Sequence, residues 1–548
     1  MAEYTRLVGF TSPRLSGDHH DDHDHDADAF EHDDLAFHDT ELDEKQKPLS
    51  TVVIKEGTSA SDLDTDPEDN LDVEKQHQQR QEERSSPVPK WKQYKTYSSL
   101  MKSWCIAALP TFCQPGGLRR KGQLRPTARL DALRGYAAWI VFHYHCFNSY
   151  SPSWRRQPFI SFFWAGPGMV ALFFVISGYV LSYSLLKQMR RRQSTAMLES
   201  LASSSFRRYI RLYASSVVAT IFPLMLVRLR LYNGAGSLHV PTFFGQVSDW
   251  LYNNLYFINP FADIRGWYHQ GTIDSKYLGT LWTIPVEFRG SMILFGFCAA
   301  VCKLTTPWRM GLTWLIIILS YVWNTVFVAE FLFGMFVADV SLSRNPDLVR
   351  RQPLPTTHTA PAGTTRDRVD RWDEKSTRRQ KALRIARNVG YVLLFILGVF
   401  FLGQPDGVDL GVWGNFPWQF LKSFIPPYYG NGSEYYFYLS MGGFFLLLAL
   451  DSLPILQRPL NWGFSQYVGE LSFGIYALHP PLTFAFFRDR MEPWRAKHLG
   501  DSPLAFIPGY ILMTLLVFIT ADYFTRLDKK VVKGGRWLQS KLFRTWDD

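Results

Sequence analysis

The sequence is poor in cysteine, with five among 548 residues, and no two of them form the CxxC pair of a metal site. Cys146, Cys298 and Cys302 lie in or near apolar runs, so no disulfide framework is indicated and no bound metal is expected. Cys105 and Cys113 lie in the moderately apolar stretch "MKSWCIAALPTFCQPGG". That stretch suits interfacial attachment or S-palmitoylation, and two unmodified thiols fit it equally well.

Other familiar signals are absent. The N-terminus "MAEYTRLVGFTSPRLSG" has no apolar core, so we expect no cleavable signal peptide and expect the first apolar run to direct the chain to the membrane. No repeat of fixed period is visible.

The net charge of +10 is the sum of an acidic first hundred residues and a strongly basic remainder. Because no nucleic-acid-binding module accompanies this charge, basic loops between apolar runs explain it better.

Residues 1–95 are predicted to form a disordered, acidic, His/Asp-rich tail. The stretch "HHDDHDHDADAFEHDD", His19 to Asp34, suits weak metal binding, a response to pH, or simply a solvated tail, and the last is favoured. Residues 96–124 follow as a juxtamembrane segment, residues 125–530 as a membrane domain, and residues 531–548 as a basic tail.

Long apolar runs fill the membrane domain, and about 20 residues suffice for a helix to cross a bilayer. The fold class expected is therefore all-α, a polytopic membrane protein with about ten transmembrane helices. The runs are 133–152, 164–186, 212–228, 281–302, 308–323, 326–342, 388–404, 435–453, 467–487 and 504–524.

Basic residues predict the orientation of these runs. With ten crossings, the segments "RRKGQLRPTARLDALR", "KQMRRRQ" with "FRRYIR", 344–387 and "KKVVKGGRWLQSKLFR" all fall on one side. The positive-inside rule makes that side the cytoplasm, so both termini are expected there. The sequon at Asn431 then falls outside, in modest agreement.

Three ionisable residues lie inside apolar runs. Counted at 1.5 Å per residue, His145, Glu287 and His479 all fall roughly 18–20 Å from the inner edge. Each suits either an interhelical hydrogen bond or a functional site, and three at one depth favour function. His143 and His145 are two residues apart, so they cannot share one helical face, and His143 is expected to point toward another helix or the acceptor side.

Four arginines lie on the predicted cytoplasmic side: Arg134, Arg207, Arg208 and Arg211. Most arginines at such positions only anchor the end of a membrane helix at the cytoplasmic surface. Arg208 and Arg211, however, are three apart on one face and are predicted to lie at the start of a helix, which suits a phosphate-bearing ligand.

Small residues mark the second run, "GPGMVALFFVISGYVLSY". Gly166, Gly168 and Gly178 are expected to allow close helix packing, and Ser177 with Gly178 to open space for a ligand, although packing alone fits each glycine as well. Pro285, two residues before Glu287, is predicted to kink or start its helix.

Five stretches together resemble the acyltransferase-3 family of polytopic membrane acyltransferases. They are "RLDALRGYAAWIVFHYHCF", with ten residues between Arg134 and His145, "ALFFVISGYVLS", "SFRRYIRLY", "LWTIPVEF" and "VGELSFGIYALHPPL". They occur in the order typical of that family and cover about residues 125–530. The chain departs from the family pattern at Ala132, at Ala214 and in "VEFRG", which indicates a divergent subgroup.

The resemblance implies transfer of an acyl group, often acetyl, from cytosolic acyl-CoA to a hydroxyl-type acceptor, with acyl-CoA as a co-substrate and no permanently bound cofactor. It makes His145 the main catalytic residue, with Glu287 and His479 as further catalytic candidates. It assigns Arg134, Arg207, Arg208 and Arg211 to the CoA phosphates, and Ser177 is expected near the donor. Neither His143 nor His145 begins the HxxxxD motif of soluble acyltransferases, because Asn148 and Tyr150 stand five residues further on.

Two other readings remain open. A secondary transporter or proton-coupled carrier also has many spans with buried His and Glu, but no inverted repeat is evident. A non-catalytic membrane sensor explains the acidic tail but not the ordered motifs. The acceptor, whether glycan, lipid, sterol or secondary metabolite, and the membrane, whether plasma or internal, are not specified by these residues.

Overall fold

The computed structural model describes residues 101–119, 124–147, 152–232, 238–260, 275–349, 378–405, 416–426, 429 and 434–543. The chain divides into two compact units, Met1–Asp34 with Leu118–Asp548, and Leu35–Gly117. In the second unit, a helix over 101–108 precedes the 3-10 turn Thr111–Cys113, and both cysteines are exposed. The predicted acidic tail, residues 1–95, lies outside the described residues.

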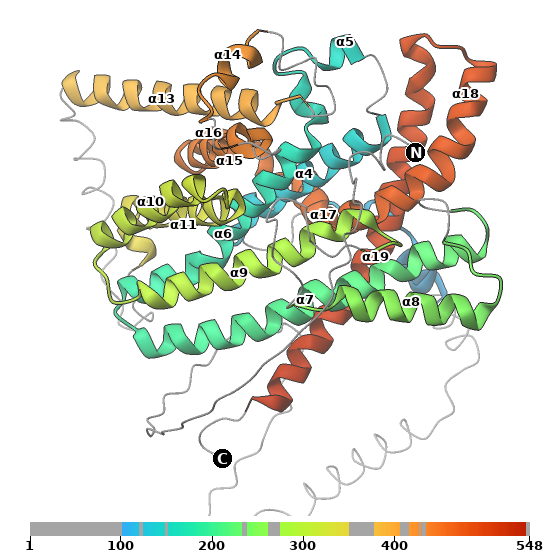
Figure 1. The fold of residues 1–548 in the computed structure, drawn as a ribbon, viewed down its shortest axis with the longest axis horizontal. Helices are drawn as coiled ribbons and strands as arrows, with labels where there is room; N and C mark the ends of the chain where they lie inside the picture. Colours follow the sequence, from blue (N-terminus) through green and yellow to red (C-terminus); the bar gives the residue numbers. More distant parts are fainter. Residues whose placement is uncertain are drawn as a thin grey trace, which may run out of the picture. The chain divides into compact units, whose positions relative to one another are not determined.

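The first unit is built from helices, and its described residues form no β-strand (Figure 1). The main helices are α4 (Ala128–Phe147), α6 (Gly166–Arg190), α7 (Ser194–Arg228), α8 (Phe243–Phe257), α9 (Thr283–Ala300), α10 (Thr306–Val322), α11 (Val326–Arg344), α13 (Arg378–Leu402), α15 (Glu434–Ser452), α17 (Gly463–Leu482) and α19 (Ile507–Leu542). Shorter elements are α5 (Pro152–Arg155), η2 (Ser161–Trp164), η3 (Gly279–Trp282), η4 (Pro346–Leu348), α14 (Trp418–Lys422), α16 (Pro454–Gln457), η6 (Pro459–Asn461), the π-helix η7 (Thr483–Met491), α18 (Glu492–His498) and η8 (Pro503–Phe506).

Each of the ten predicted runs overlaps one of the main helices, but fewer helices qualify as membrane spans. Within the described residues, five are long and apolar enough, or up to six if the bent pair Glu434–Ser452 and Pro454–Asn461 forms one span. The number of predicted runs exceeds the number of qualifying helices because some helices carry charge within their own length. The helix α4, for example, begins with "ARLDALR". The chain therefore has a multi-pass membrane character, and the ten-crossing topology remains a prediction.

The helices α6 and α11 cross at two glycines. A Cβ atom on Gly178 would collide with the backbone of Phe331, and one on Gly334 would collide with the carbonyl of Val175. Gly166 and Gly168 are equally confined, the first by the ring of Tyr144 and the second by the backbone of Leu402. The three glycines of this predicted span therefore serve close packing, as small residues do between membrane helices.

The helix α8 was not among the predicted runs. It packs along α7 (Figure 1), and its polar contacts follow α7 in reverse order: Arg228 with the carbonyl of Val240, Thr220 with Asn254, and Tyr209 with the carbonyl of Ile258. Because only one side of this 15-residue helix is apolar, it lacks a continuous apolar run. The large side chains on that side, including Phe244 and Tyr252, are exposed, while Gln246 and Asn254 are buried against the protein.

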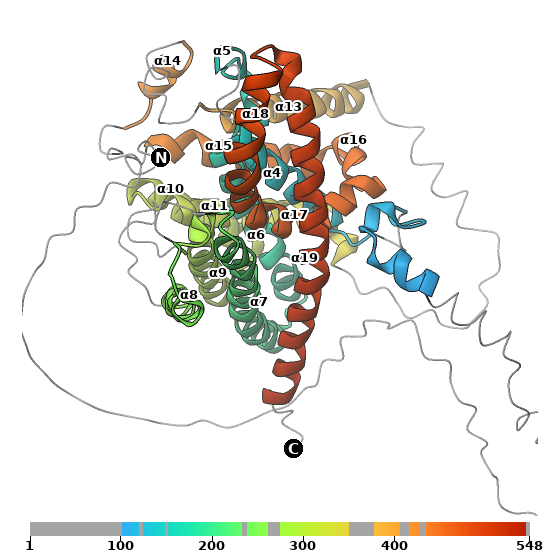
Figure 2. The same ribbon diagram turned by 90° about the vertical axis from the view of Figure 1, so that its right-hand side faces the viewer.

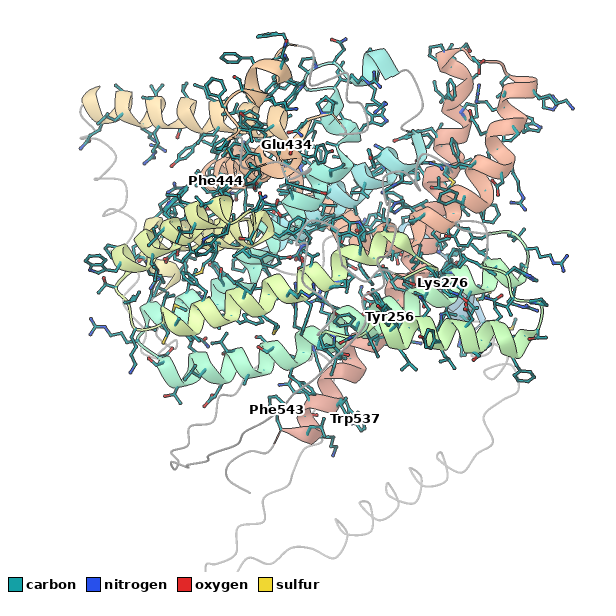
Figure 3. All side chains as sticks on the ribbon, viewed as in Figure 1. Tyr256, Lys276, Glu434, Phe444, Trp537 and Phe543 are labelled. Atoms are coloured by element: carbon teal, nitrogen blue, oxygen red, sulfur yellow. The ribbon has the colours of Figure 1, made fainter. Side chains whose placement is uncertain are left out.

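Two further arrangements hold the site region. Lys276, labelled in Figure 3, belongs to the segment leading to α9. Its ammonium group donates to Asp249 of α8. The long helix α19 packs against α17 and α7 (Figures 1 and 2). Pro285 lies in the first turn of α9, so this proline begins a helix, one of the two outcomes that its position predicted.

Candidate active site

The helices α4 and α17 cross where two glycines face each other. A Cβ atom on Gly135 would lie 2.5 Å from the backbone N of Gly469, and one on Gly469 would lie 2.7 Å from the carbonyl of Asp131. Ten residues beyond each glycine stands a histidine, His145 on α4 and His479 on α17. Because the two offsets are equal and the histidines meet, the helices run parallel and the crossing sets the register of the pair.

The imidazole rings of His145 and His479 are stacked, with centroids 5.2 Å apart and planes inclined by 29°. His479 is fully buried, and its Nδ1 lies 2.9 Å from the carbonyl of Ile475. A carbonyl only accepts, so Nδ1 carries the hydrogen and Nε2 carries the lone pair. That Nε2 is buried and has no hydrogen-bond partner among the described residues.

His145 is partly exposed, and a cation that the motifs did not identify lies beside it. Arg488 donates a hydrogen bond of 3.3 Å to the His145 carbonyl, and its guanidinium lies 4.6 Å from the centre of the Phe484 ring. Arg488 belongs to η7, which continues α17 after two consecutive prolines. This π-helix is nine residues long, and π segments that interrupt α-helices are frequent at functional sites. The Pro480-Pro481 pair marks its position in the sequence.

His143 has different surroundings from its neighbour. Its Nε2 lies 3.0 Å from the hydroxyl of Tyr510, on α19, and its ring packs against Trp139 and Trp164. The helical spacing had predicted that it points toward another helix, and it does.

Glu287 pairs with an arginine. Its carboxylate accepts from Arg208 of α7, and the Arg208 Nε donates to Ser291 at 3.0 Å. Ser291 lies one turn after Glu287 on α9 and donates to the Glu287 carbonyl at 2.6 Å. Arg134 bonds to Asp131 and interacts electrostatically with Arg208 and Arg211. Arg134, Arg208, Arg211 and Glu287 thus form one cluster, called the arginine cluster below.

One part of the phosphate prediction is wrong. The helix α7 begins at Ser194, so Arg208 is its fifteenth residue and the free backbone N–H groups of a helix start are not beside it. The polar stretch "STAMLESLASSS" continues the helix ahead of the apolar run, which is why hydropathy placed its beginning too late. Arg207 and Arg211 are exposed, and neither forms an ion pair among the described residues. Ser177 is buried in α6 and, among the described residues, forms no hydrogen bond with the arginines or the histidines.

Two residues connect the histidine pair to the arginine cluster. Thr283 of α9 lies 2.9 Å from the hydroxyl of Tyr476 on α17, measured between the two oxygens. Glu287 lies one turn beyond Thr283, and His479 lies one turn beyond Tyr476. Counted along the two helices through the Thr283–Tyr476 contact, the path between the two groups is about two helical turns, on the order of 11 Å. Glu287 thus lies with the arginines, and the described contacts do not place it against either imidazole.

No group of three or more His, Cys, Asp or Glu suited to a metal ion occurs within the described ranges. The chemistry available is that of two stacked imidazoles, with a set of guanidinium groups nearby. Imidazole suits proton transfer near neutral pH, and guanidinium suits phosphate.

Comparison with known proteins finds similar acyltransferases. The chain is 28% identical over 472 residues to O-acetyltransferase PaAT-1 of Phomopsis amygdali, covering 80% of this chain and 88% of that protein. It is 21% identical over 470 residues to acyltransferase clz18 of Cochliobolus lunatus, covering 73% and 92%, and 20% identical over 422 residues to acyltransferase R4 of a Phoma species, covering 66% and 83%. No solved structure matches. The family model described as an acyltransferase domain matches residues 127–522, and the chain therefore belongs to the acyltransferase-3 family.

Proposed function

We propose that this membrane acyltransferase moves an acyl group, expected to be acetyl, from acyl-CoA to a hydroxyl-type acceptor. The observation that carries the proposal is the stacked pair His145 and His479, held by the glycine crossing at a distance of about two turns from the arginine cluster. The relative from Phomopsis amygdali is named an O-acetyltransferase, which supports an oxygen acceptor and an acetyl group here.

The arginine cluster is proposed to bind the phosphates of CoA. Arg208 is held in place by Glu287 and Ser291, so it offers a fixed positive charge rather than a mobile one. Arg207 and Arg211 are exposed and unpaired among the described residues, which leaves their guanidinium groups for an anionic donor. Guanidinium groups bind phosphate oxygens through paired, charge-assisted hydrogen bonds.

The direction of the donor follows from the basic segments. They are proposed to face the cytoplasm, together with both termini, so CoA enters from that side. The acyl-pantetheine arm then extends from the arginine cluster past Thr283 and Tyr476 to the histidines. The gap of about 11 Å is one that this extended arm can cover.

The proposed reaction has two proton transfers. His145 takes the proton from the acceptor hydroxyl as its oxygen attacks the thioester carbonyl carbon. The tetrahedral intermediate then releases the CoA thiolate, which takes the proton back from the His145 imidazolium, so an ester and free CoA form without other reactants. His479 presents a buried, unpartnered Nε2 beside this step and keeps one fixed tautomer through its bond to Ile475.

The experiment uses the full chain purified into lipid nanodiscs and supplied with acetyl-CoA labelled in the acetyl group. The expected result is release of CoA, with label transferred to an added extract of host metabolites and lipids. Protein that neither releases CoA nor transfers label would contradict the proposal. Uptake of a labelled solute by the same protein in sealed vesicles, without CoA release, would favour a carrier instead.

A further inference from the structure

A polar stripe runs along one side of α9, a helix that is mostly apolar. Its members are Thr283, Glu287 and Ser291, each four residues from the next. The two later members bind Arg208 of α7, Glu287 through the ion pair and Ser291 through the hydrogen bond of 3.0 Å. The first member binds α17 instead, where Thr283 meets the hydroxyl of Tyr476. One side of α9 is thus bonded both to the arginine cluster and to the helix that carries the second histidine.

Tyr476 holds the start of α9 at two points. Its hydroxyl donates to the carbonyl of Thr280 in η3 at 2.8 Å, and its oxygen lies 2.9 Å from Oγ1 of Thr283. Thr283 Oγ1 is farther from the same carbonyl, at 3.3 Å, so the tyrosine hydrogen goes to the carbonyl and Thr283 donates to the tyrosine oxygen. All three residues are buried, where an unmade hydrogen bond is costly.

The ring of Tyr476 is held independently of its hydroxyl. It packs edge-on against Phe173 of α6, with ring centroids 5.8 Å apart. Tyr476 and His479 are three residues apart on one face of α17, and their ring centroids are 6.3 Å apart. The hydroxyl therefore has a fixed position relative to the histidine pair.

This contact sets the spacing between the two halves of the proposed donor site. An α-helix fixes residues one turn apart at about 5.4 Å along its axis. Holding Thr283 against α17 therefore fixes Glu287, and with it Arg208, relative to His479. A donor that is bound by its phosphates and attacked at its thioester depends on this spacing, because a misplacement of about 1 Å can cost about 10²-fold in rate.

We propose that Tyr476 is a positioning residue, whose hydroxyl ties the start of α9 to α17 and so sets the distance from the donor's phosphates to its reacting thioester. The contact between Tyr476 and the start of α9 is called the tether below. The inference rests on the proposed function and adds a residue that touches neither the phosphates nor the reacting atoms.

The test compares two donors in nanodiscs by following the release of thiol. One is acetyl-CoA, and the other is S-acetylpantetheine, which has the same thioester on the same arm but no phosphate. Tyr476→Phe removes only the hydroxyl and is expected to lower kcat for acetyl-CoA about 10- to 100-fold, with KM within about threefold, because the arginines still bind the phosphates. Its kcat/KM for S-acetylpantetheine is expected to stay within about twofold of wild type, because that donor does not use the arginine cluster.

Thr283 supplies the partner variants. Thr283→Ser keeps the hydroxyl and should retain the wild-type kcat, whereas Thr283→Val should lower kcat for acetyl-CoA selectively. Because Tyr476→Phe and Thr283→Val break the same bond, the double variant should be no slower than Tyr476→Phe alone.

Tyr321→Phe is the matched control. The Tyr321 hydroxyl bonds to Ser440 and so joins α10 to α15, neither of which belongs to the tether. Its loss should change the rates with the two donors by the same factor. An equal fall for both donors in Tyr476→Phe would overturn the proposal, as would a raised KM for acetyl-CoA at constant kcat.

Amide hydrogen exchange tests the tether without turnover. Exchange over residues 279–290, which hold η3 and the start of α9, should be about 10-fold faster in Tyr476→Phe and unchanged in Tyr321→Phe. If wild type releases no CoA from acetyl-CoA, the proposed function fails, and this measurement still decides the tether. If wild type does not accept S-acetylpantetheine, exchange and the split between kcat and KM for acetyl-CoA decide it together. Equal exchange in wild type and Tyr476→Phe would refute the tether in either case.

Discussion

At the scale of single residues, the two stacked imidazoles are not equivalent. His479 has its tautomer set by the carbonyl of Ile475 and is fully buried, whereas His145 is partly exposed and lies beside Arg488. The Arg134-to-His145 spacing identified His145, and the "ALHPP" stretch identified His479, but no property of either stretch shows that the rings touch. The sequence likewise did not pair Glu287 with Arg208, because hydropathy began the third run at residue 212, eighteen residues after the start of α7.

His479→Asn tests the second imidazole. The asparagine amide still donates to the Ile475 carbonyl but offers no equivalent of Nε2, so the helix end is preserved while the lone pair is lost. We expect kcat for CoA release to fall at least about 10-fold, with the thermal midpoint unchanged within a few degrees. A kcat within twofold of wild type would show that Nε2 takes no part in the reaction.

Arg211→Gln tests the arginine cluster. Removing one exposed, unpaired guanidinium is expected to raise the KM for acetyl-CoA about 10-fold while leaving kcat nearly unchanged, because a charge-assisted bond to phosphate contributes about 1.4 kcal/mol to binding. Arg228→Gln, at the C-terminal end of α7, is the control and should leave this KM unaltered. A fall in kcat at constant KM would place Arg211 in the chemical step instead.

At the scale of elements, the parallel crossing of α4 and α17 positions the site. The equal spacing, ten residues from Gly135 to His145 and ten from Gly469 to His479, is present in the sequence but acquires meaning only when the two helices are known to pack. Hydropathy found the helices because apolar length is a local property. Hydropathy missed α8, because the apolar residues of this helix lie on one side. It also extended the ninth predicted span past the end of α17 into the start of η7.

Gly135→Ala tests the crossing. Its Cβ atom would lie 2.5 Å from the backbone of α17, and a backbone cannot rotate away as a side chain can. We expect the helices to separate, a loss of about 1–3 kcal/mol in stability and a loss of most activity. Gly296→Ala, in α9 with open space around it, is the control and should be neutral or slightly stabilising. Equal behaviour of both variants in thermal and activity assays would refute the crossing.

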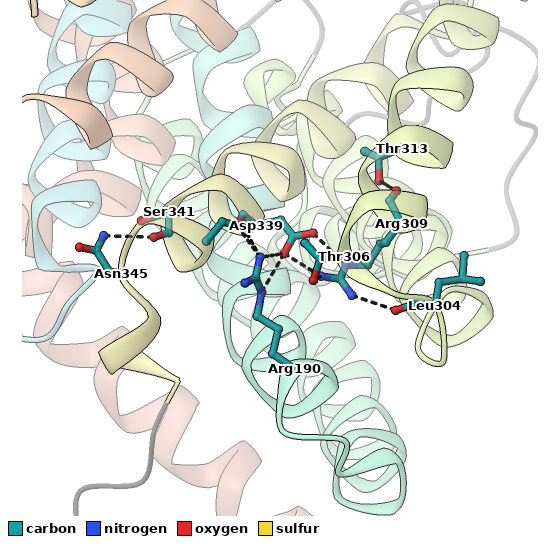
Figure 4. Close-up of polar contacts among 9 residues, drawn as sticks. Arg190, Leu304, Thr306, Arg309, Thr313, Asp339, Ser341 and Asn345 are labelled. Atoms are coloured by element: carbon teal, nitrogen blue, oxygen red, sulfur yellow. Dashed lines mark hydrogen bonds and ion pairs between the residues drawn. The ribbon is translucent and has the colours of Figure 1, made fainter. Parts of the chain in front are cut away.

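At the scale of the membrane unit, a buried ion cluster joins α6, α10 and α11. Asp339 accepts from Arg309 at 2.8 Å and from Arg190 at 2.6 Å, and Arg309 also donates to Thr306 at 3.2 Å (Figure 4). Two guanidinium groups thus depend on one carboxylate. The sequence does not pair these three residues. Arg190 and Arg309 lie near the ends of apolar runs, where positive-inside anchoring is the simpler expectation, and no pattern assigns a partner to Asp339.

Asp339→Asn is expected to destabilise the protein by about 3–5 kcal/mol, since it leaves the buried Arg309 and the part-buried Arg190 without a counter-charge. Thermal unfolding in detergent measures this loss. Glu470→Gln breaks the exposed pair with Lys529 and should cost only about 0–1 kcal/mol. Similar unfolding temperatures for the two variants would mean that the buried cluster does not hold these helices together.

The most direct measurement compares two matched histidine variants, His145→Gln and His143→Gln, for CoA release from acetyl-CoA in nanodiscs. The account predicts that His145→Gln lowers kcat by about 10²–10⁴-fold, because the proton acceptor is removed. His143→Gln, whose side chain instead faces Tyr510, should stay within several-fold of wild type. A folded His145→Gln protein with full activity, or a His143→Gln protein that alone is inactive, would contradict the account.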